Sequence, residues 1–402
     1  MATPYQTSTD LIASVKRKIA VPISQNTFTE EDILSFANEE MMISQVPSVM
    51  VYHEEYFVTV KDVPLEYGRT KYQIPERAIG RKIRDLYYLD TQGSIQEMTQ
   101  INSDDRSHFT SGQSSAGIHK FYFEGDFVAL VANENSSLVG SLRFDYFLRP
   151  NLLVLNERAA ISTTFSKTIT VDNATLVTGD TVTVGTTVFT ADTDFAIGAS
   201  SIDTATNLSL AINANGEYAS ENGSPVSTTV VTVRYPILST PFATSNSAAF
   251  TIPLTQRGIE FDNVPANIAE GSLIDFLQTR GGHRSLSMSV KVPANSIIGN
   301  TIIFDEGDVP TDFVIGDYLC TEYECIIPQI PDDLHTGLSE RTCARILASL
   351  GDAEGLKMSN QKITEIEARQ GTLLDNRAEG APQKINNRNS LLRFAKRRLN
   401  RR

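Results

Sequence analysis

The stretch Pro331–Leu374, PDDLHTGLSERTCARILASLGDAEGLKMSNQKITEIEARQGTLL, decides the fold class that this sequence predicts. Its first half carries a stripe of apolar and small side chains at helical spacing, followed by Gly351, a residue type that commonly ends helices. Its second half repeats apolar side chains at near-heptad spacing from Ala353 onward. Residues 331–378 are therefore predicted to form a helical hairpin. The two stripes are Leu338, Thr342, Cys343, Ile346, Leu347 and Leu350, and Leu356, Ile363, Ile366, Gln370 and Leu373.

A third helix is expected near the start of the chain. Thr29 is suited to cap a helix whose first turn, residues 30–32, is acidic, as the helix dipole favours. An apolar stripe follows as far as Met41, and Pro47 ends or bends the helix. No other element is long enough to bury this stripe, so we expect it to pack against the hairpin. Residues 1–28, rich in Thr, Ser and Gln, are expected to form an extended N-terminal arm.

The middle of the chain has the pattern of β-structure. Short aromatic and branched runs between turn-forming clusters predict strands in 29–159, after the helix, and again in 261–330. Residues 160–260 differ in being rich in Thr and Val and poor in Lys and Arg. There Thr181–Val184 and Thr187–Thr190 flank a two-residue turn typical of a hairpin. The predicted fold class is α+β: a small helical core made of the N-terminal helix and the C-terminal hairpin, with β-rich excursions and an inserted β-rich module.

Charge is distributed unevenly along the chain. The net charge is −13, but between Arg377 and Arg402 nine lysines and arginines stand against one acid, Glu379. This end therefore carries +8, and the other 376 residues carry −21. The basic C-terminal tail, residues 379–402, is either solvated and without a specific role or docked on an acidic partner, for which a neighbouring protein and DNA are both candidates. Its preference for Arg over Lys and its interleaved apolar side chains favour docking.

The sequence contains no motif that is specific for catalysis, a metal or a cofactor. Its histidines are dispersed, and Cys320, Cys325 and Cys343 match no common zinc spacing. Gly112–Gly117 misses the nucleophile-elbow pattern, and Arg280–His283 lacks the rest of a phosphate loop. The first twenty residues lack the apolar core of a signal peptide, and no stretch approaches the roughly 18 apolar residues of a membrane span. We expect a soluble protein that is not an enzyme and holds no cofactor or metal.

Several stretches resemble the head-to-tail adaptor, or connector, proteins of tailed bacteriophages. None is a catalytic signature, and their order along the chain carries the resemblance. They are TEEDILSFANEEM (Thr29–Met41), HEEYFV (His53–Val58), YQIPERAIGRKIRDL (Tyr72–Leu86), FYFEGDFVAL (Phe121–Leu130), FDYFLRPNLLV (Phe144–Val154), PQIPDDLHTGLSERTCARIL (Pro328–Leu347), LGDAEGL (Leu350–Leu356) and INNRNSLLR (Ile385–Arg393). Within the insert, DTVTVGTTVFT (Asp180–Thr190) and TATNLSLAINA (Thr204–Ala214) resemble a small β-rich module of phage tail proteins.

The resemblance implies a virion structural protein that forms a dodecameric ring in the neck, between the portal protein and a downstream tail or neck protein. Double-stranded DNA would pass through the ring without sequence-specific binding, because an acidic wall makes no phosphate contacts. The protein would be synthesised in the host cytoplasm and would not contact a membrane. The implied portal-binding residues lie in the basic tail: Arg388, Leu391, Leu392, Arg393, Phe394, Lys396, Arg397, Arg398, Arg401 and Arg402.

The sequence leaves other readings open. A tail-tube ring, a fibre-anchoring protein or a capsid decoration protein would share the β-rich insert and the acidic body. The basic tail distinguishes the adaptor, because it needs a recipient groove such as a portal provides. A third reading is that the tail binds packaged DNA, in which case binding would weaken steeply with salt.

Overall fold

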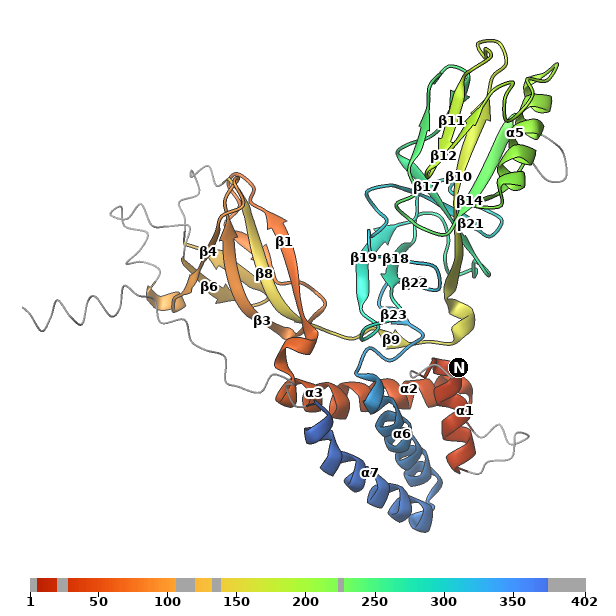
Figure 1. Ribbon diagram of the computed structural model, residues 1–402. Helices are drawn as coiled ribbons and strands as arrows, with labels where there is room; N and C mark the ends of the chain where they lie inside the picture. Colours follow the sequence, from red (N-terminus) through yellow and green to blue (C-terminus); the bar gives the residue numbers. More distant parts are fainter. Residues whose placement is uncertain (1–5, 20–27, 106–119, 132–138, 223–227, 375–402) are drawn as a thin grey trace, which may run out of the picture.

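The computed structural model describes residues 6–19, 28–105, 120–131, 139–222 and 228–374. The protein has the predicted α+β fold, arranged as a helical platform with two β lobes on one side of it (Figure 1). The first β lobe comprises the described residues between 58 and 148, and the second comprises those between 160 and 325. Over the described ranges, no helix is both long enough and apolar enough to cross a bilayer.

The helical platform combines helices from the two ends of the chain. These are α1 (Ser8–Ile19), α2 (Glu30–Glu40), α3 (Val46–Tyr52), α6 (His335–Leu350) and α7 (Ala353–Leu374). Helix α2 begins at the predicted cap, where the Thr29 hydroxyl accepts the N–H of Asp32 and the Asp32 carboxylate accepts the N–H of Thr29. Helix α6 ends at the predicted Gly351, whose φ of 74° is the left-handed conformation that favours glycine.

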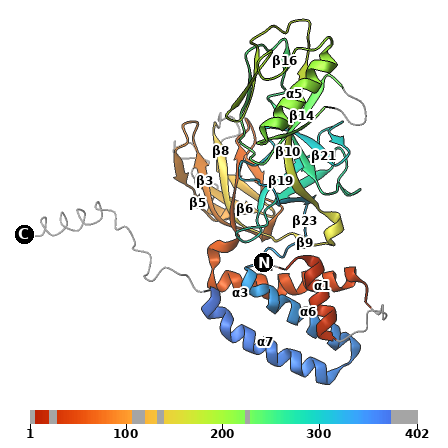
Figure 2. The same ribbon diagram turned by 45° about the vertical axis from the view of Figure 1, so that its right-hand side comes forward.

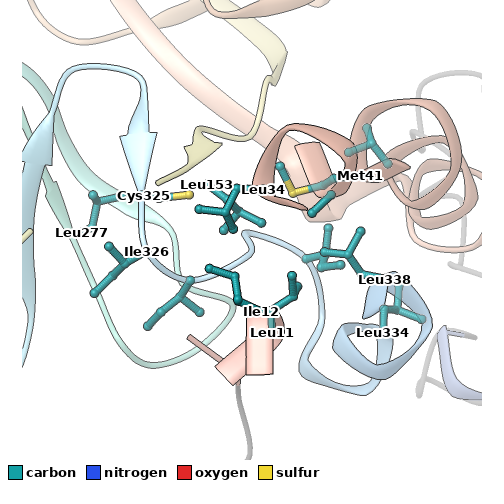
Figure 3. Close-up of a cluster of buried hydrophobic side chains, with 14 of the residues drawn as sticks. Leu11, Ile12, Leu34, Met41, Leu153, Leu277, Cys325, Ile326, Leu334 and Leu338 are labelled. Atoms are coloured by element: carbon teal, nitrogen blue, oxygen red, sulfur yellow. The ribbon is translucent and has the colours of Figure 1, made fainter. Parts of the chain in front are cut away.

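One hydrophobic core holds the platform together (Figure 3). Helix α2 contributes Leu34 to this core, its C-terminal cap contributes Met41, and helix α6 contributes Leu338. Arg341 of α6 also donates to the hydroxyl of Ser44, in the turn that follows α2, across 297 residues of sequence. The prediction that the N-terminal helix packs against the C-terminal hairpin is therefore confirmed. Helix α7 covers α6 but keeps most of its own surface exposed.

The expectation of an extended arm over residues 1–28 is wrong for Ser8–Ile19, which is helix α1. Its Leu11, Ile12 and Val15 are buried in the platform core. The helix is capped by Thr7, whose hydroxyl accepts the N–H of Asp10. The apolar stripe and the cap were both present in the sequence, but the surrounding Thr, Ser and Gln obscured them.

Helices α2 and α3 are joined by a π-helical turn, Met41–Gln45, so the helix continues toward Pro47 instead of ending there. Pro47 lies in the first turn of α3, where a missing N–H costs little. The wider turn places both Met41 and Gln45 in buried positions and brings Ser44 to Arg341. It thereby fixes which face α3 presents to the core.

The first β lobe is built from two four-stranded sheets, ordered β1-β8-β3-β4 and β2-β7-β6-β5. Between the sheets lies a separate core that includes Tyr72, Phe144 and Tyr146. The strands are β1 (Val58–Pro64), β2 (Lys71–Gln73), β3 (Ala78–Leu89), β4 (Ile95–Glu97), β5 (Thr99–Gln100), β6 (Lys120–Glu124), β7 (Phe127–Leu130) and β8 (Ser141–Leu148).

The second β lobe contains a ten-stranded sheet in which β10 (Ala160–Val171) is central. The other strands of this sheet are β13 (Ala219–Glu221), β14 (Val230–Tyr235), β16 (Phe250–Thr251), β17 (Gln256–Phe261), β18 (Leu273–Leu277), β19 (Ser285–Lys291), β20 (Ile297–Ile298), β21 (Thr301–Asp305) and β22 (Tyr318–Thr321). A short parallel pair, β9 (Leu152–Leu153) with β23 (Glu324–Cys325), lies at the foot of the lobe beside the platform (Figure 2).

Most of the expected insert, 160–260, lies at the end of this lobe that is far from the platform, but β10 begins at the nearer end, where Ala160 pairs with Leu319 of β22 (Figure 1). Its predicted hairpin, β11 (Thr181–Val184) with β12 (Thr187–Thr190), pairs in the expected register, and β15 (Phe242–Thr244) joins it. Helix α5 (Ser201–Asn215) covers β14 and shares a core with this hairpin. However, β10 contributes Ile169 to this core and Phe165 to the next one, and residue 260 falls inside β17. The second lobe therefore continues without a break across both expected boundaries of the insert.

Candidate functional site

The candidate functional site is the central junction, where the first lobe, the second lobe and the platform meet. Arg77, in the connection between β2 and β3 of the first lobe, reaches Asp275 on β18 of the second lobe. The pairing is bidentate: Nη1 lies 2.7 Å from Oδ2, and Nη2 lies 2.9 Å from Oδ1. Arg77 is 6% exposed and Asp275 is fully buried, so this ion pair is shielded from water.

The Arg77 guanidinium has further partners in the second lobe. Nη2 lies 3.3 Å from both the Glu322 carboxylate and the Ser289 hydroxyl, and the guanidinium carbon lies 4.2 Å from the centre of the Tyr323 ring. Burial alone would lower the pKa of Arg77, but the hydrogen bonds and charge of Asp275 and Glu322 raise it above its usual value. The cation is therefore held permanently charged and in a fixed position.

The Asp275 carboxylate is saturated with donors. Besides Arg77 it accepts the side-chain N–H of Asn151 at 2.9 Å, the backbone N–H of Ser289 at 2.9 Å and that of Tyr323 at 3.2 Å. Its acceptor positions are thus occupied by donors from both lobes and from the chain between them, so Asp275 is suited to hold these segments together.

Asn151 extends the junction toward the platform. Its backbone N–H donates to the side-chain oxygen of Gln329 at 2.7 Å, and the Gln329 side-chain nitrogen donates to the backbone oxygen of His283 at 3.1 Å. Leu153, two residues after Asn151, pairs through its backbone with the side chain of Asn38 on α2. The Asn38 side chain donates to the Leu153 oxygen at 3.1 Å and accepts its N–H at 2.7 Å. All three parts of the molecule are thus joined by hydrogen bonds within one short region.

His283 and His335 lie on the platform side of the junction. His283 Nε2 lies 2.6 Å from Asp332 Oδ1. His335 Nδ1 accepts the backbone N–H of Gln6 at 3.1 Å, and its Nε2 faces the backbone oxygens of Pro328 and Ile330 at 3.2 Å. This network assigns the proton of neutral His335 to Nε2. Burial, and then the neighbouring His283, lower the pKa of His335 to about 4.

Ligand atoms of His283, Asp332 and His335 lie within 4.8 Å of one another, a separation that could hold a metal ion. Both ring nitrogens of His335 are already engaged, however, and its Nδ1 lone pair accepts the N–H that holds the segment before α1. A metal would have to displace Gln6 from His335. We therefore assign these side chains to fixing α1 and the start of α6 at the junction.

Ion pairs on the platform hold α7 in place. On α6, Arg341 pairs with Glu367 of α7 and lies 3.7 Å from the carboxylate of Glu40 on α2. Arg345, one turn further along α6, pairs with Glu39 and lies 2.7 Å from Glu40. Helix α7, the element that leads into the basic tail, is thus tied through α6 to the N-terminal helix.

Several stretches on which the expected adaptor resemblance rests supply residues of this junction. Arg77 comes from Tyr72–Leu86, Asn151 from Phe144–Val154, and Gln329 and His335 from Pro328–Leu347. Sequence reasoning missed the central role of Asp275, because an acid inside an apolar strand, LIDFL, was the only local signal. Sequence reasoning also missed the position of His283 at the junction, because this residue was considered only as the end of the glycine-containing stretch Arg280–His283.

The predicted portal-binding residues, from Arg388 to Arg402, all lie outside the described residues, so their surroundings remain a prediction. Cys320 and Cys325 are fully buried, and burial raises the pKa of both thiols, which makes them unreactive at neutral pH. His335 is not their neighbour but belongs to the junction described above.

Comparison of the chain with family models and with curated proteins gave no match.

Proposed function

We propose that this protein is a head-to-tail adaptor of a tailed-bacteriophage particle, a structural component and not an enzyme. One observation carries the proposal: helices from both chain ends form a single platform, and both β lobes lie on the opposite side from α7 (Figures 1 and 2). A molecule built this way offers one face to a partner above it and another to a partner below. That is what a protein between a portal and a tail component requires.

The rigidity of the central junction supports the same proposal. A ring closes only if each subunit holds its contact surfaces at a constant angle. The buried Arg77–Asp275 pair and the Asn151–Gln329 contact fix the two lobes relative to the platform. We propose a dodecameric ring in the virion neck whose acidic residues, part of a −21 body, line a channel for double-stranded DNA.

The basic tail is the proposed contact with the portal. Ordering a chain segment costs roughly 1–2 kcal/mol per residue, so a few contacts would not hold it. A long groove on the portal would supply carboxylates for Arg388, Arg393 and the arginines that follow. It would also supply apolar notches for Leu391 and Phe394, worth roughly 1.5–3 kcal/mol each when fully buried. Since like-charged bodies repel, we expect the free protein to be monomeric and to form the ring on the portal.

Truncation after Gly380 tests this proposal. The truncated protein should unfold at the same temperature as the full chain but should no longer bind portal rings in sedimentation, and infection should yield heads without tails. A control chain in which every tail Arg is replaced by Lys keeps the charge but loses bidentate geometry, so it should bind with intermediate affinity. Infectious particles from the truncated protein would refute the role of the tail.

A tail-tube ring, a fibre-anchoring protein or a capsid decoration protein is the alternative, and the location of the chain in a symmetric reconstruction of the particle decides between them. Binding of the tail to DNA is a further alternative. It predicts an affinity for DNA that falls steeply with salt, whereas docking in a groove through buried apolar side chains should depend on salt only weakly.

A further inference from the structure

A cavity of about 610 Å³ lies in the second lobe, beside β10, β17 and the loops near residues 236–242 and 306–314. Its walls are mainly apolar, and three of its lining residues, Ile237, Leu254 and Val314, are exposed hydrophobic side chains at the surface. A cavity of this size and composition matches those that bind small organic molecules or a few residues of a peptide. The apolar walls are Phe165, Pro236, Ile237, Leu238, Pro241, Phe242, Leu254, Val309, Phe313 and Val314.

Two buried cations belong to this apolar cavity. Lys167 on β10 is 6% exposed, and Arg257 on β17 is 8% exposed. Lys167 follows Ser166 on β10, Arg257 precedes Gly258 on β17, and Ser166 pairs with Gly258. The two cations therefore face each other across neighbouring antiparallel strands. They are two of only three Lys and Arg residues in the whole of 160–260, so a stretch that almost excludes positive charge concentrates it here.

The cavity does not supply enough negative charge for both cations. Of the residues that the structure describes, Glu306 is the only acid that lines the cavity; it pairs with Arg257, and its side chain is 50% exposed. Within the described part of the chain, Lys167 donates only to the backbone oxygen of Leu254, at 3.3 Å, and it lies 5.6 Å from the centre of the Phe242 ring. The Nε of Arg257 is buried and has no hydrogen-bond partner among the described residues. Like charges facing each other across two strands destabilise a fold unless an anion lies between them.

Electrostatics agree with the geometry. Burial lowers the pKa of Lys167, Glu306 acts to raise it, and Arg257 acts to lower it further. A second acceptor beside Lys167 would relieve both the burial cost and the repulsion.

We propose that this cavity binds a carboxylate carried on an apolar body, with Lys167 and Arg257 holding the carboxylate and the aromatic and aliphatic walls holding the rest. Charge-assisted hydrogen bonds from two cations suit a carboxylate, and the apolar walls suit an aromatic or branched body better than a strongly hydrated anion such as free phosphate. Two sources share this chemistry: the C-terminal residue of a partner protein, and a free organic acid. The proposal does not depend on the role of the chain as an adaptor.

Calorimetric titration of the full chain with 3-phenylpropionate tests the proposal, with 3-phenylpropanamide as the uncharged counterpart. The acid should bind at least tenfold more tightly than the amide. Lys167→Met and Arg257→Met should each weaken binding of the acid at least tenfold. Arg234→Met is the matched control, because Arg234, the third cation of 160–260, already pairs with Glu221 and Glu260 and does not line the cavity. It should leave the affinity unchanged.

Two outcomes would overturn the proposal: no binding of the acid to the wild-type chain, or equal affinities for acid and amide. A misfolded variant would also bind weakly, so the folding of each variant is checked by its unfolding curve. If both Met variants misfold, Lys167→Arg, which keeps the charge, should still bind the acid, and a loss of binding there with an intact unfolding curve would also count against the proposal.

A second titration distinguishes the two sources. The peptide acetyl-Ala-Ala-Phe with a free C-terminus should bind at least tenfold more tightly than 3-phenylpropionate if the cavity receives the end of a partner chain. Equal or weaker binding assigns the cavity to a small organic acid. Either result retains a carboxylate ligand, because both probes carry one.

Discussion

The central junction and the cavity of the second lobe each contain a buried arginine, but the two arginines differ in how many hydrogen-bond acceptors surround them. Arg77 and Arg257 are exposed to nearly the same small extent, 6% and 8%. Arg77 has a bidentate carboxylate, a second acid, a hydroxyl and an aromatic ring within reach. Arg257 shares one half-exposed acid with a neighbouring lysine and leaves its Nε without a partner. Burial alone therefore does not reveal what a cation is for; the number of acceptors around it does.

The largest expected effect comes from removing the cation at the junction. Arg77→Met leaves the buried Asp275 charge without its main partner, which typically costs about 3–5 kcal/mol of unfolding free energy. Arg143→Met is the matched control, because Arg143 is also bidentate, to Asp62, but at a solvent-exposed site, where removing the pair should change the unfolding free energy little. Denaturant unfolding measures both. Equal losses would show that the junction is no stronger than a surface contact.

The second-largest effect on stability is expected when the pH is lowered, because His335 at the junction is held neutral. The pKa of His335 falls from 6.5 in an unfolded chain to about 4 in the folded one, because burial disfavours the charged ring. The unfolded chain therefore binds more protons between these values, so the contribution is complete above pH 6.5 and is lost as the pH falls toward 4. At 1.36 kcal/mol per pKa unit the loss approaches about 3 kcal/mol. Unfolding free energies across this range should show a steeper slope for the wild type than for His335→Gln, and identical slopes would refute the assignment.

Replacing both partners of the junction pair sharpens the comparison further. Arg77→Met combined with Asp275→Leu removes the two charges together, so no unpaired carboxylate remains. Some donors to Asp275 stay unsatisfied, but the double variant should recover roughly 1–3 kcal/mol relative to the sum of the single variants. Strict additivity in a double-mutant cycle would mean that the two side chains do not act as a pair.

The smallest effect on stability is expected at the cavity. Lys167→Met removes a buried cation that has one long hydrogen bond and a like-charged neighbour, so the unfolding free energy should change by less than about 1 kcal/mol, toward greater stability. Thermal unfolding measures the change. A loss as large as that at Arg77 would mean that Lys167 holds the fold together and that the two regions do not differ.

Local signals in the sequence predicted local structure well. The Thr29 cap, the Gly351 end of α6, the hairpin at 181–190 and the course of α7 were each encoded within a few residues, and the structure has them where the sequence placed them. The packing of the N-terminal helix on the hairpin followed from its apolar stripe, which needed a partner.

Contacts between distant residues were not predictable in this way. Arg77 and Asp275 are 198 residues apart, and nothing in either segment specifies the other. The boundaries expected for the insert, 160 and 260, followed a change in amino-acid composition. Because β10 contributes side chains to two hydrophobic cores, the boundary between these cores lies elsewhere than the change in composition. Helix α1 was missed because its short apolar stripe lies in a polar stretch.

The platform also has a consequence for the order of events during synthesis. Helices usually form early because their contacts are local, yet here α1 and α2 must wait for α6, which leaves the ribosome about 300 residues later. The first lobe, whose strands and core lie within residues 58–148, has all its partners long before then. The first β lobe should therefore fold first, and the helical platform should fold last. Until α6 arrives, the apolar faces of α1 and α2 lack the cover that α6 gives them in the folded protein.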